Sequence, residues 1–225
     1  GNGKYLGVNS ENLYMLGTDR AENFVEICKT REFKTQVFSA DSLRLPIRDG
    51  GADAAISIAV IHHFSTKELR IQAIRELARI VRSGGRILIY VWAFEQDTGK
   101  KFEHQDVLVP WHLQFKYEDE EKIPGAGSTK EKEGGEKKEA GDRKEVEAVE
   151  EKKDSEISSV KSDSKKTGDA KTFVDEEKKA VVYKRYYHLF IKGELEENVK
   201  EVKEVDLVTS YYDHANWCVI LLKKQ

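Results

Sequence analysis

Glycines and carboxylates stand at the ends of short apolar runs in the first part of the chain. Gly1-Asn2-Gly3 comes first, and Asp19 and Asp41 each close a run that is predicted to be a strand. Glycine lets the backbone approach a ligand closely, and an acid at the next strand end can bind ribose hydroxyls. Ligands of doubly wound folds bind beyond the carboxyl ends of the strands, so one crevice is expected. The predicted cofactor-binding residues are Gly1, Asn2, Gly3, Asp19, Arg20, Asp41, Ser42 and Ala59.

The same residues also have purely structural explanations. A Gly-x-Gly sequence can mark only a turn, Asp19 can be a turn acid, and Asp41 can cap a neighbouring element. A ligand site is favoured because suitable residues follow consecutive predicted strand ends, including the segment 59–63.

Hydrophobic patterning predicts the elements that position these residues. Ser65 and Glu68 have the spacing of a capping box that opens a helix, and Ser83-Gly84-Gly85 is predicted to stop it. A further short helix and an antiparallel hairpin are expected near the end of the chain. The expected strands are 13–19, 35–41, 53–61, 86–92, 205–212 and 217–222, and the other expected helices are 20–32 and 193–202.

Strands that alternate with helices predict an α/β fold with a mostly parallel sheet. The closing antiparallel pair is the usual mark of the class I methyltransferase sheet. A nicotinamide-dependent enzyme is the nearest alternative for such a crevice, but the sequence shows no Tyr-x-x-x-Lys pair for short-chain dehydrogenase chemistry.

Composition divides the chain of 225 residues into three parts. Residues 1–117 and 172–225 carry the apolar runs and are predicted to form one core. Residues 118–171 are rich in Lys, Glu, Asp, Gly and Ser, and such a segment cannot bury enough apolar surface to order itself. We therefore predict a charged, flexible insertion there, with an RNA-contacting or regulatory arm as the alternative.

The overall charge gives little guidance to function. The net charge is -3 and the pI is about 6.2, so a basic footprint for nucleic acid would have to be local. The two cysteines are far apart, which fits a reducing compartment. No apolar run reaches the ~18 residues that a membrane helix needs, so no membrane association is expected.

Five segments carry more specific information. They are 53–66 (DAAISIAVIHHFST), 86–93 (RILIYVWA), 105–113 (QDVLVPWHL), 185–196 (RYYHLFIKGELE) and 210–221 (SYYDHANWCVIL). Together they resemble the eukaryotic carboxymethyluridine tRNA methyltransferases, and the last is especially similar to members fused to an AlkB-like dioxygenase. The Pro-Trp-His and Arg-Tyr-Tyr-His sequences are not general methyltransferase features.

The resemblance implies a class I fold that transfers a methyl group from S-adenosylmethionine to the carboxylate of 5-carboxymethyluridine at the tRNA wobble position. It also implies a small zinc-binding activator protein as partner and a cytoplasmic, or also nuclear, location. Two features depart from the family. Ser83 replaces the usual proline before Gly-Gly, and the family's first strand, which ends in Asp-x-Gly-Cys before Gly1, is absent. That strand is central in this fold, so the chain is expected to be a fragment with a weakened cofactor site.

The implied reaction requires alignment more than activation. A carboxylate has a pKa of about 4 and is ionised at neutral pH, so it needs no general base. A cationic or hydrogen-bonding group must hold it in line with the methyl donor. The predicted catalytic residues are His62 and Arg185, and the predicted substrate-binding residues are Trp111, His112, Tyr187 and His188. No metal site is predicted, because the adjacent side chains of His62 and His63 diverge on an extended segment.

Structural explanations stay open for several of these residues. His62 can be a satisfied loop histidine, Trp111 can anchor a lid, and Trp217 is expected in the core. Tyr186 and Tyr187 point opposite ways on an extended segment, so at most one faces the site. Two other functions also stay open, namely methylation of another carboxylate, hydroxyl or amine, and a non-catalytic protein that keeps the fold.

Overall fold

The computed structural model describes residues 1–8, 11–30, 35–97, 99, 101–114, 172–175 and 180–225, and only the backbone at 111–114, 172–175 and 180–181. These residues belong to two compact units, Gly1–Trp111 with Lys184–Gln225, and His112–Tyr183. The whole of the predicted insertion, 118–171, lies outside the described residues. No helix of the described part is long and apolar enough to cross a membrane.

The first two strands form a parallel pair. β1 (Met15–Asp19) and β2 (Thr35–Ser39) lie side by side in register, joined through the helix α1 (Glu22–Lys29), which buries Val25 and Cys28. Both strands and the helix between them were predicted. This arrangement brings the carboxyl ends of β1 and β2 to the same edge, where the amide of Ala40 donates to the carbonyl of Asp19 at 3.0 Å.

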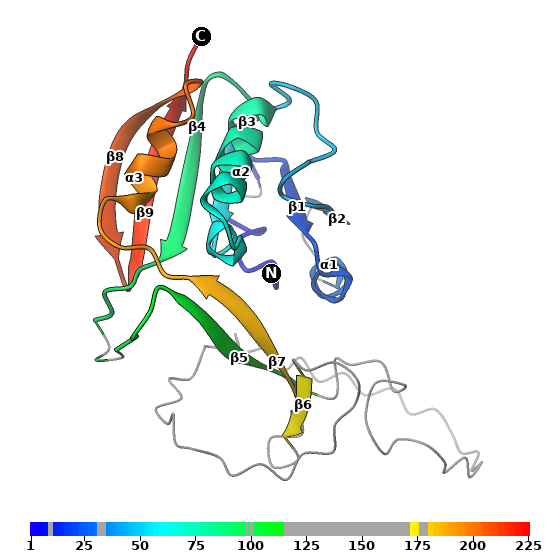
Figure 1. Cartoon of the computed structure of the whole chain (residues 1–225). Coiled ribbons are helices and arrows are strands. Elements are labelled where there is room, and N and C mark those ends of the chain that lie inside the picture. Colours follow the sequence, from blue (N-terminus) through cyan, green and yellow to red (C-terminus); the bar gives the residue numbers. More distant parts are fainter. Residues whose placement is uncertain (9–10, 31–34, 98, 100, 115–171, 176–179) are drawn as a thin grey trace, which may run out of the picture. The chain divides into compact units, whose positions relative to one another are not determined.

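Four strands form a second sheet in the order β3-β4-β9-β8, which Figure 1 shows with β8 on the left and β3 beside the helix α2. β3 (Ala52–Ile58) and β4 (Val81–Trp92) are parallel, whereas β9 (Asn216–Lys223) is antiparallel to β4 and to β8 (Val205–Asp213). The predicted C-terminal hairpin is confirmed. Among the described strands, β1 and β3 share no hydrogen-bonded neighbour.

The main core lies between this sheet and two helices, α2 (Lys67–Ile80) and α3 (Glu194–Lys200). Apolar residues recur at helical spacing on α2 and at every second position on β4, so both present one face to the core. Trp217 is buried there, as expected. The core residues from these elements are Ala73, Ile74, Leu77, Ala78, Ile80, Val81, Ile87, Ile89, Val91, Leu195, Val199, Trp217, Val219 and Leu221.

The predicted boundaries of α2 were wrong at both ends. Its N-cap is Thr66 rather than Ser65, because the Thr66 hydroxyl accepts from the amide of Leu69 at 3.3 Å. The helix ends at Ile80, before the Gly-Gly pair, and the chain enters β4 directly. Gly85 has another role: β4 passes so close to β3 at this point that a Cβ on residue 85 would lie 2.5 Å from the carbonyl oxygen of Asp53.

Three strands that sequence patterning did not predict form a third sheet. β5 (Asp106–Gln114), β7 (Ala180–His188) and β6 (Thr172–Asp175) follow the order β5-β7-β6, and β6 and β7 are antiparallel. The N-terminal half of β5 and the C-terminal half of β7 belong to the larger unit. They carry residues of the candidate site.

Candidate functional site

The predicted glycine loop and the first strand end lie together. The amino group of Gly1 contacts the carboxylate of Asp19, and its carbonyl accepts from the thiol of Cys28 at 3.2 Å. Gly3 has a φ of 75°, a left-handed conformation that favours glycine. The backbone of this loop therefore lies at the carboxyl end of β1, as predicted for a cofactor loop.

Asp19 and Asp41 both shape turns at this edge. Asp19 Oδ1 accepts from the amide of Ala21 at 2.8 Å, and Asp41 Oδ1 accepts from the amide of Leu43 at 2.9 Å. These bonds match the structural explanation for each acid. They also fix the two carboxylates at neighbouring strand ends, and a carboxylate oxygen can accept a second hydrogen bond from a ligand.

Arg20 and Ser42 follow the two acids in the chain. Arg20 is exposed, and its carbonyl accepts from the hydroxyl of Ser39 at 3.4 Å, so this contact is made by its backbone. Ser42 is half-buried. The ligand roles of both residues stay predictions.

The chain turns sharply where β3 ends. β3 stops at Ile58, three residues earlier than predicted, and Ala59 has a φ of 59°, in the left-handed region that a residue with a Cβ rarely adopts. The amide of Ala59 donates to the carbonyl of Tyr90 at 3.1 Å. A short 3-10 helix, η1 (Ile61–His63), follows and presents two histidines. Strain of this kind is most often found at functional sites.

Four rings, which we call the aromatic cluster, surround the end of η1: His62, His63, Trp92 and Tyr187. The ring of Tyr187 stacks on His62 with centroids 4.8 Å apart, and lies 4.6 Å from Trp92 and 4.5 Å from His63. His62 has no exposed surface. Trp92 was not predicted as a site residue, although its position at the end of a predicted strand was the available signal.

His62 is held as a neutral hydrogen-bond donor. Its Nδ1 accepts from the backbone amide of Trp92 at 3.1 Å, so the proton of the neutral ring is on Nε2. That Nε2 is buried and has no hydrogen-bond partner among the described residues. Burial, followed by the charges of His63 and His188, sets the pKa of His62 well below its usual value. A neutral His62 therefore cannot attract a carboxylate by charge, and its one lone pair, on Nδ1, is occupied by the amide of Trp92 and is not free to act as a base.

His63 has the opposite tautomer. Its Nδ1 lies 2.9 Å from the carbonyl oxygen of Tyr186, and a carbonyl only accepts, so Nδ1 carries the proton. Burial lowers the pKa of His63, and the bond to Tyr186 opposes that effect. In the neutral ring Nε2 then retains a lone pair.

Arg185 supplies a positive charge beside this cluster. Its guanidinium lies 5.6 Å from the ring centroid of Phe24 on α1, and it interacts electrostatically with Asp19. Burial lowers the pKa of Arg185, whereas Tyr187 and Asp19 raise it. The predicted catalytic arginine thus reaches the edge that carries the predicted cofactor-binding acid, although the two residues are 166 positions apart in the sequence (185 minus 19).

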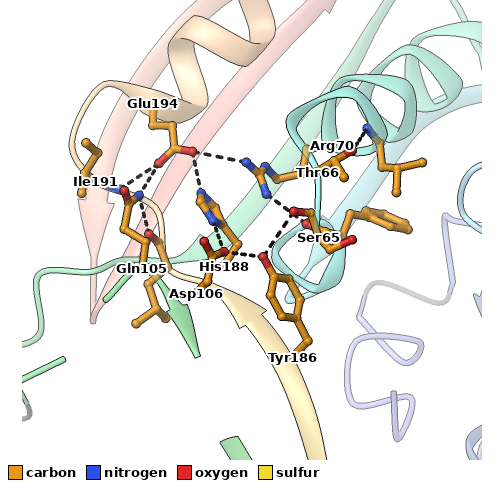
Figure 2. A network of polar contacts seen from close by, with 12 residues as sticks. Ser65, Thr66, Arg70, Gln105, Asp106, Tyr186, His188, Ile191 and Glu194 are labelled. Carbon is orange, nitrogen blue, oxygen red and sulfur yellow. Dashed lines mark hydrogen bonds and ion pairs between the residues drawn. The ribbon is translucent and has the colours of Figure 1, made fainter. Parts of the chain in front are cut away.

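Tyr186 and Tyr187 point to different partners, as expected for neighbours on a strand. Tyr187 enters the aromatic cluster, while the hydroxyl of Tyr186 donates to Asp106 and lies 3.4 Å from the carbonyl of Ser65. His188 follows, and Figure 2 shows it between the carboxylates of Asp106 and Glu194. Both ring nitrogens of His188 thus contact the protein itself, and a substrate contact by this side chain stays a prediction.

Asp106, Glu194 and Arg70 were not predicted as site residues. Each comes from a different element, and Arg70 occupies a buried position on α2 with Glu194 3.7 Å away. Trp111 and His112, which were predicted to bind substrate, lie on β5, but their side chains are outside what the structure describes.

A cavity of about 510 Å³ lies away from these residues, lined in part by Arg75, Arg79 and Arg82. Arg79 pairs with Glu76 and Asp49, and Arg82 pairs with Asp53. Arg79 and Arg82 are thus balanced by acids, and Arg75 donates to the backbone carbonyl of Glu201 at 3.3 Å. Within the described residues, no group of three or more potential metal ligands is present.

Comparisons with known proteins agree with this architecture. A family model described as "Methyltransferase domain" matches residues 1–89. Solved structures share the fold at low identity: an S-adenosylmethionine-dependent methyltransferase from Clostridium acetobutylicum (7% identity, TM-score 0.55, 95% of this chain and 76% of that one) and the PH0226 protein from Pyrococcus horikoshii (15%, 0.51, 95% and 73%). The fold is therefore that of a class I S-adenosylmethionine-dependent methyltransferase domain.

Curated relatives define the family more closely. A tRNA (carboxymethyluridine(34)-5-O)-methyltransferase of Arabidopsis thaliana is 33% identical over 294 residues, which cover all of this chain and 70% of that protein. The mouse tRNA (carboxymethyluridine(34)-5-O)-methyltransferase ALKBH8 is 35% identical over 255 residues, covering 99% of this chain and 37% of that protein. The chain belongs to the tRNA (carboxymethyluridine(34)-5-O)-methyltransferase family. It spans little more than a third of the length of ALKBH8.

A second branch is also similar. The mouse protein named "Probable tRNA methyltransferase 9B" is 55% identical over 112 residues, covering half of this chain and 24% of that protein.

Proposed function

We propose that this chain is the catalytic part of an enzyme that methylates the carboxylate of 5-carboxymethyluridine at the tRNA wobble position, forming the methyl ester. The observation that carries the proposal is the state of His62, which is buried, neutral and able only to donate through Nε2. A site with such a donor suits an acceptor that is already ionised. The names of the relatives in two kingdoms support the same substrate.

S-adenosylmethionine supplies the electrophilic methyl group when it is bound, and the described residues fit such a ligand. The left-handed Gly3 exposes the backbone of the glycine loop, while Asp19 and Asp41 place acceptors for ribose hydroxyls or an amine at the adjacent strand ends. The loop, the two acids and the turn at Ala59 are the groups that we propose to hold the cofactor.

Arg185 and His62 have complementary roles in this proposal. The guanidinium of Arg185 attracts and orients the substrate carboxylate, because its planar donors match the two carboxylate oxygens. Its interactions with Asp19 and Tyr187 reduce its free charge, so the carboxylate is held without being trapped by a strong ion pair. The Nε2–H of His62 lies in the plane of its ring, so it can donate to a carboxylate oxygen while Tyr187 stays stacked on the ring face.

The proposed reaction is tested with isotopically labelled S-adenosylmethionine and tRNA that carries carboxymethyluridine. After digestion, mass spectrometry should find the label in the methyl ester of the wobble nucleoside. A hydroxymethyl analogue of the nucleoside should accept no methyl group, because it is not ionised and His62 provides no base. Label in that analogue, or in another nucleoside, would refute the proposal.

A second acceptor class is favoured by one observation. The neutral ring of His63 retains a lone pair on Nε2, and His63 is exposed, so it could deprotonate a hydroxyl or amine acceptor. The variants His62→Gln and His63→Gln separate the two. Ester formation should depend on His62 and tolerate His63→Gln, whereas base catalysis would fail in His63→Gln and show a fall in rate as the pH decreases.

Two further parts of the proposal rest on family resemblance. We propose that the protein works with a small zinc-binding activator, which co-purification of the two proteins would test.

We also propose a cytoplasmic location. Cys28 and Cys218 are both buried, and each thiol donates to a backbone carbonyl, which is consistent with a reducing compartment. Imaging of the tagged full-length protein would test this location.

A further inference from the structure

His188 lies between two carboxylates in a partly buried polar network that we call the histidine clamp: Arg70, Asp106, Tyr186, His188 and Glu194 (Figure 2). Its Nδ1 is 2.8 Å from Asp106 Oδ1, and its Nε2 is 2.6 Å from Glu194 Oε1. His188 has only 7% of its surface exposed. The clamp contains none of the residues that we propose to hold the cofactor or the substrate carboxylate. The predicted substrate contact of His188 does not explain why both of its ring nitrogens meet carboxylates of the protein.

The two contacts determine the protonation state of the ring. An ionised carboxylate can only accept, so each ring nitrogen that faces one must donate, and a ring with two donors is an imidazolium. Both carboxylates are ionised. Hydrogen bonds from Tyr186 and then His188 lower the pKa of Asp106. Burial raises the pKa of Glu194, but the bond and charge of His188 and the bonds from Ile191 and Gln105 together outweigh burial, so this pKa is also lowered.

The charges in the clamp balance. Burial lowers the pKa of His188, but the hydrogen bonds to Glu194 and Asp106 outweigh it and the pKa is raised above its usual value. Arg70 of α2 lies 3.7 Å from Glu194, which supplies the second positive charge. The groups that face His188 are thus Arg70 from α2, Asp106 from β5, Tyr186 on its own strand, Glu194 from α3 and His62 from η1.

The clamp joins four elements at the place where Tyr187 enters the aromatic cluster. Tyr187 and His188 are consecutive on β7 and extend to opposite sides, so fixing one side chain fixes the other. Gln105 strengthens the same junction, because its side-chain amide donates to Glu194 at 2.8 Å and its carbonyl accepts from the amide of Leu189 at 2.7 Å. Arg70 also donates to the carbonyl of Phe64, directly after η1, at 3.0 Å.

We propose that His188 is a charged positioning residue: its imidazolium, held between Asp106 and Glu194, fixes β7 so that Tyr187 packs on His62. This inference rests on the proposed function of His62, but the protonation states can be measured without turnover. Burial is the first cause of the low pKa of His62, and the charges of His63 and His188 add to it.

The first experiment measures these states directly. In the full chain with ¹⁵N-labelled histidine, NMR should show His188 with both nitrogens protonated at a pH where His62 is neutral and protonated on Nε2. The titration midpoint of His188 should lie above about 6.5, the usual value for histidine, and that of His62 should lie below it. A neutral His188 at about pH 6.5 would overturn the proposal, whether or not the protein methylates tRNA.

The second experiment tests positioning through the pH profile. In Glu194→Gln the imidazolium loses one carboxylate, so its pKa should fall towards the usual value. Turnover should then decrease by about 25-fold between about pH 6 and about pH 8, because the protonated fraction falls about tenfold per pH unit above a pKa of about 6.5. The KM for S-adenosylmethionine should stay unchanged. Glu197→Gln on the same helix is exposed and is the matched control, with the profile of the unmodified protein.

A purely structural role predicts a different result. It would lower turnover of Glu194→Gln equally at every pH, and this outcome would reject the positioning role. If Glu194→Gln does not fold, Asp106→Asn serves instead, because the Asp106 side chain is 62% exposed and its replacement disturbs the core less. If the unmodified protein shows no turnover, the ring-current shift of His62 decides: it should change in Asp106→Asn but not in Glu197→Gln, and equal shifts in both would overturn the proposal.

Discussion

Two histidines in the same compact unit are held in opposite protonation states. His62 lies in the aromatic cluster, where its neighbours are rings and a backbone amide, and burial keeps it neutral. His188 is almost as deeply buried, but two carboxylates contact its ring and keep it charged. Burial alone therefore does not decide the charge of a histidine. The partners that each ring nitrogen meets decide it, and consecutive residues of one strand, Tyr187 and His188, connect the two environments.

Removing the charged histidine, His188, should have the largest effect on the stability of the protein. In His188→Leu the carboxylates of Asp106 and Glu194 face each other without the positive charge between them. The pair of His188 with Glu194 is the buried part, and loss of one partner from such a pair costs about 3 kcal/mol, whereas the exposed Asp106 adds little. Urea unfolding should therefore show a decrease of about 3 kcal/mol in the free energy of unfolding. Glu197→Gln, which changes an exposed charge on the same helix, should differ from the unmodified protein by less than about 0.5 kcal/mol. A similar small effect of His188→Leu would show that the clamp carries no net stability.

Arg185→Ala tests which charge serves the substrate. If His62 is neutral, Arg185 is the cation that orients the substrate carboxylate, and its loss should reduce turnover on tRNA by about 100-fold. Binding of S-adenosylmethionine should weaken much less, as calorimetry would show. Lys184→Ala, at the exposed neighbouring position of β7, is the matched control and should retain turnover. Normal turnover in Arg185→Ala would remove this residue from the proposed mechanism.

The surroundings of His62 could be predicted from the sequence better than those of His188. The α/β fold, the parallel strand pairs and the C-terminal hairpin follow from apolar periodicity, and His62 stands at the end of such a strand. The clamp could not be predicted in this way, because Arg70, Asp106, His188 and Glu194 come from four elements. Arg70 even interrupts an apolar helix face, and only the tertiary fold shows the carboxylate that pairs with it.

Local errors in the prediction have local physical causes. Ser65 and Thr66 are both good N-caps, and periodicity cannot choose between neighbours, so the helix start was displaced by one residue. The apolar run after Asp53 continues to Ile61, but the left-handed Ala59 ends the strand earlier. Apolar character alone does not show such a turn. β7 was missed because charged and aromatic residues occur at both of its alternating sets of positions, and β5 because Pro110 and His112 interrupt its apolar run.

Asp19→Ala tests cofactor binding at the ends of β1 and β2 independently of the roles of His62 and His188. Asp19 lies at the carboxyl end of β1, at the edge that we propose to hold the cofactor, so its loss should weaken binding of S-adenosylmethionine by about tenfold, as expected for one hydrogen bond to a charged group. The melting temperature should change little, because Asp19 is only partly buried. Asp53→Ala removes an exposed acid that pairs with Arg82 and is the control. Unchanged cofactor affinity in Asp19→Ala would support the alternative that Asp19 only shapes its turn.

The smallest expected effect sharpens the comparison through pH. The folded-state pKa of His62 is lowered below the usual value of about 6.5, so the unfolded chain binds the proton more readily. His62 then contributes full stability above about pH 6.5 and loses it as the pH falls, by up to about 1.4 kcal/mol per pH unit. His188 has the opposite sign, because its raised pKa stabilises the fold at low pH and this stabilisation is lost as the pH rises.

The free energy of unfolding of His62→Gln should therefore increase by about 1 kcal/mol relative to that of the unmodified protein as the pH falls from about 6.5 to about 5.5. The exposed control His104→Gln should show no such increase. Equal pH profiles for both variants would mean that His62 is as easily protonated as an exposed histidine, and the contrast between the two rings would then fail.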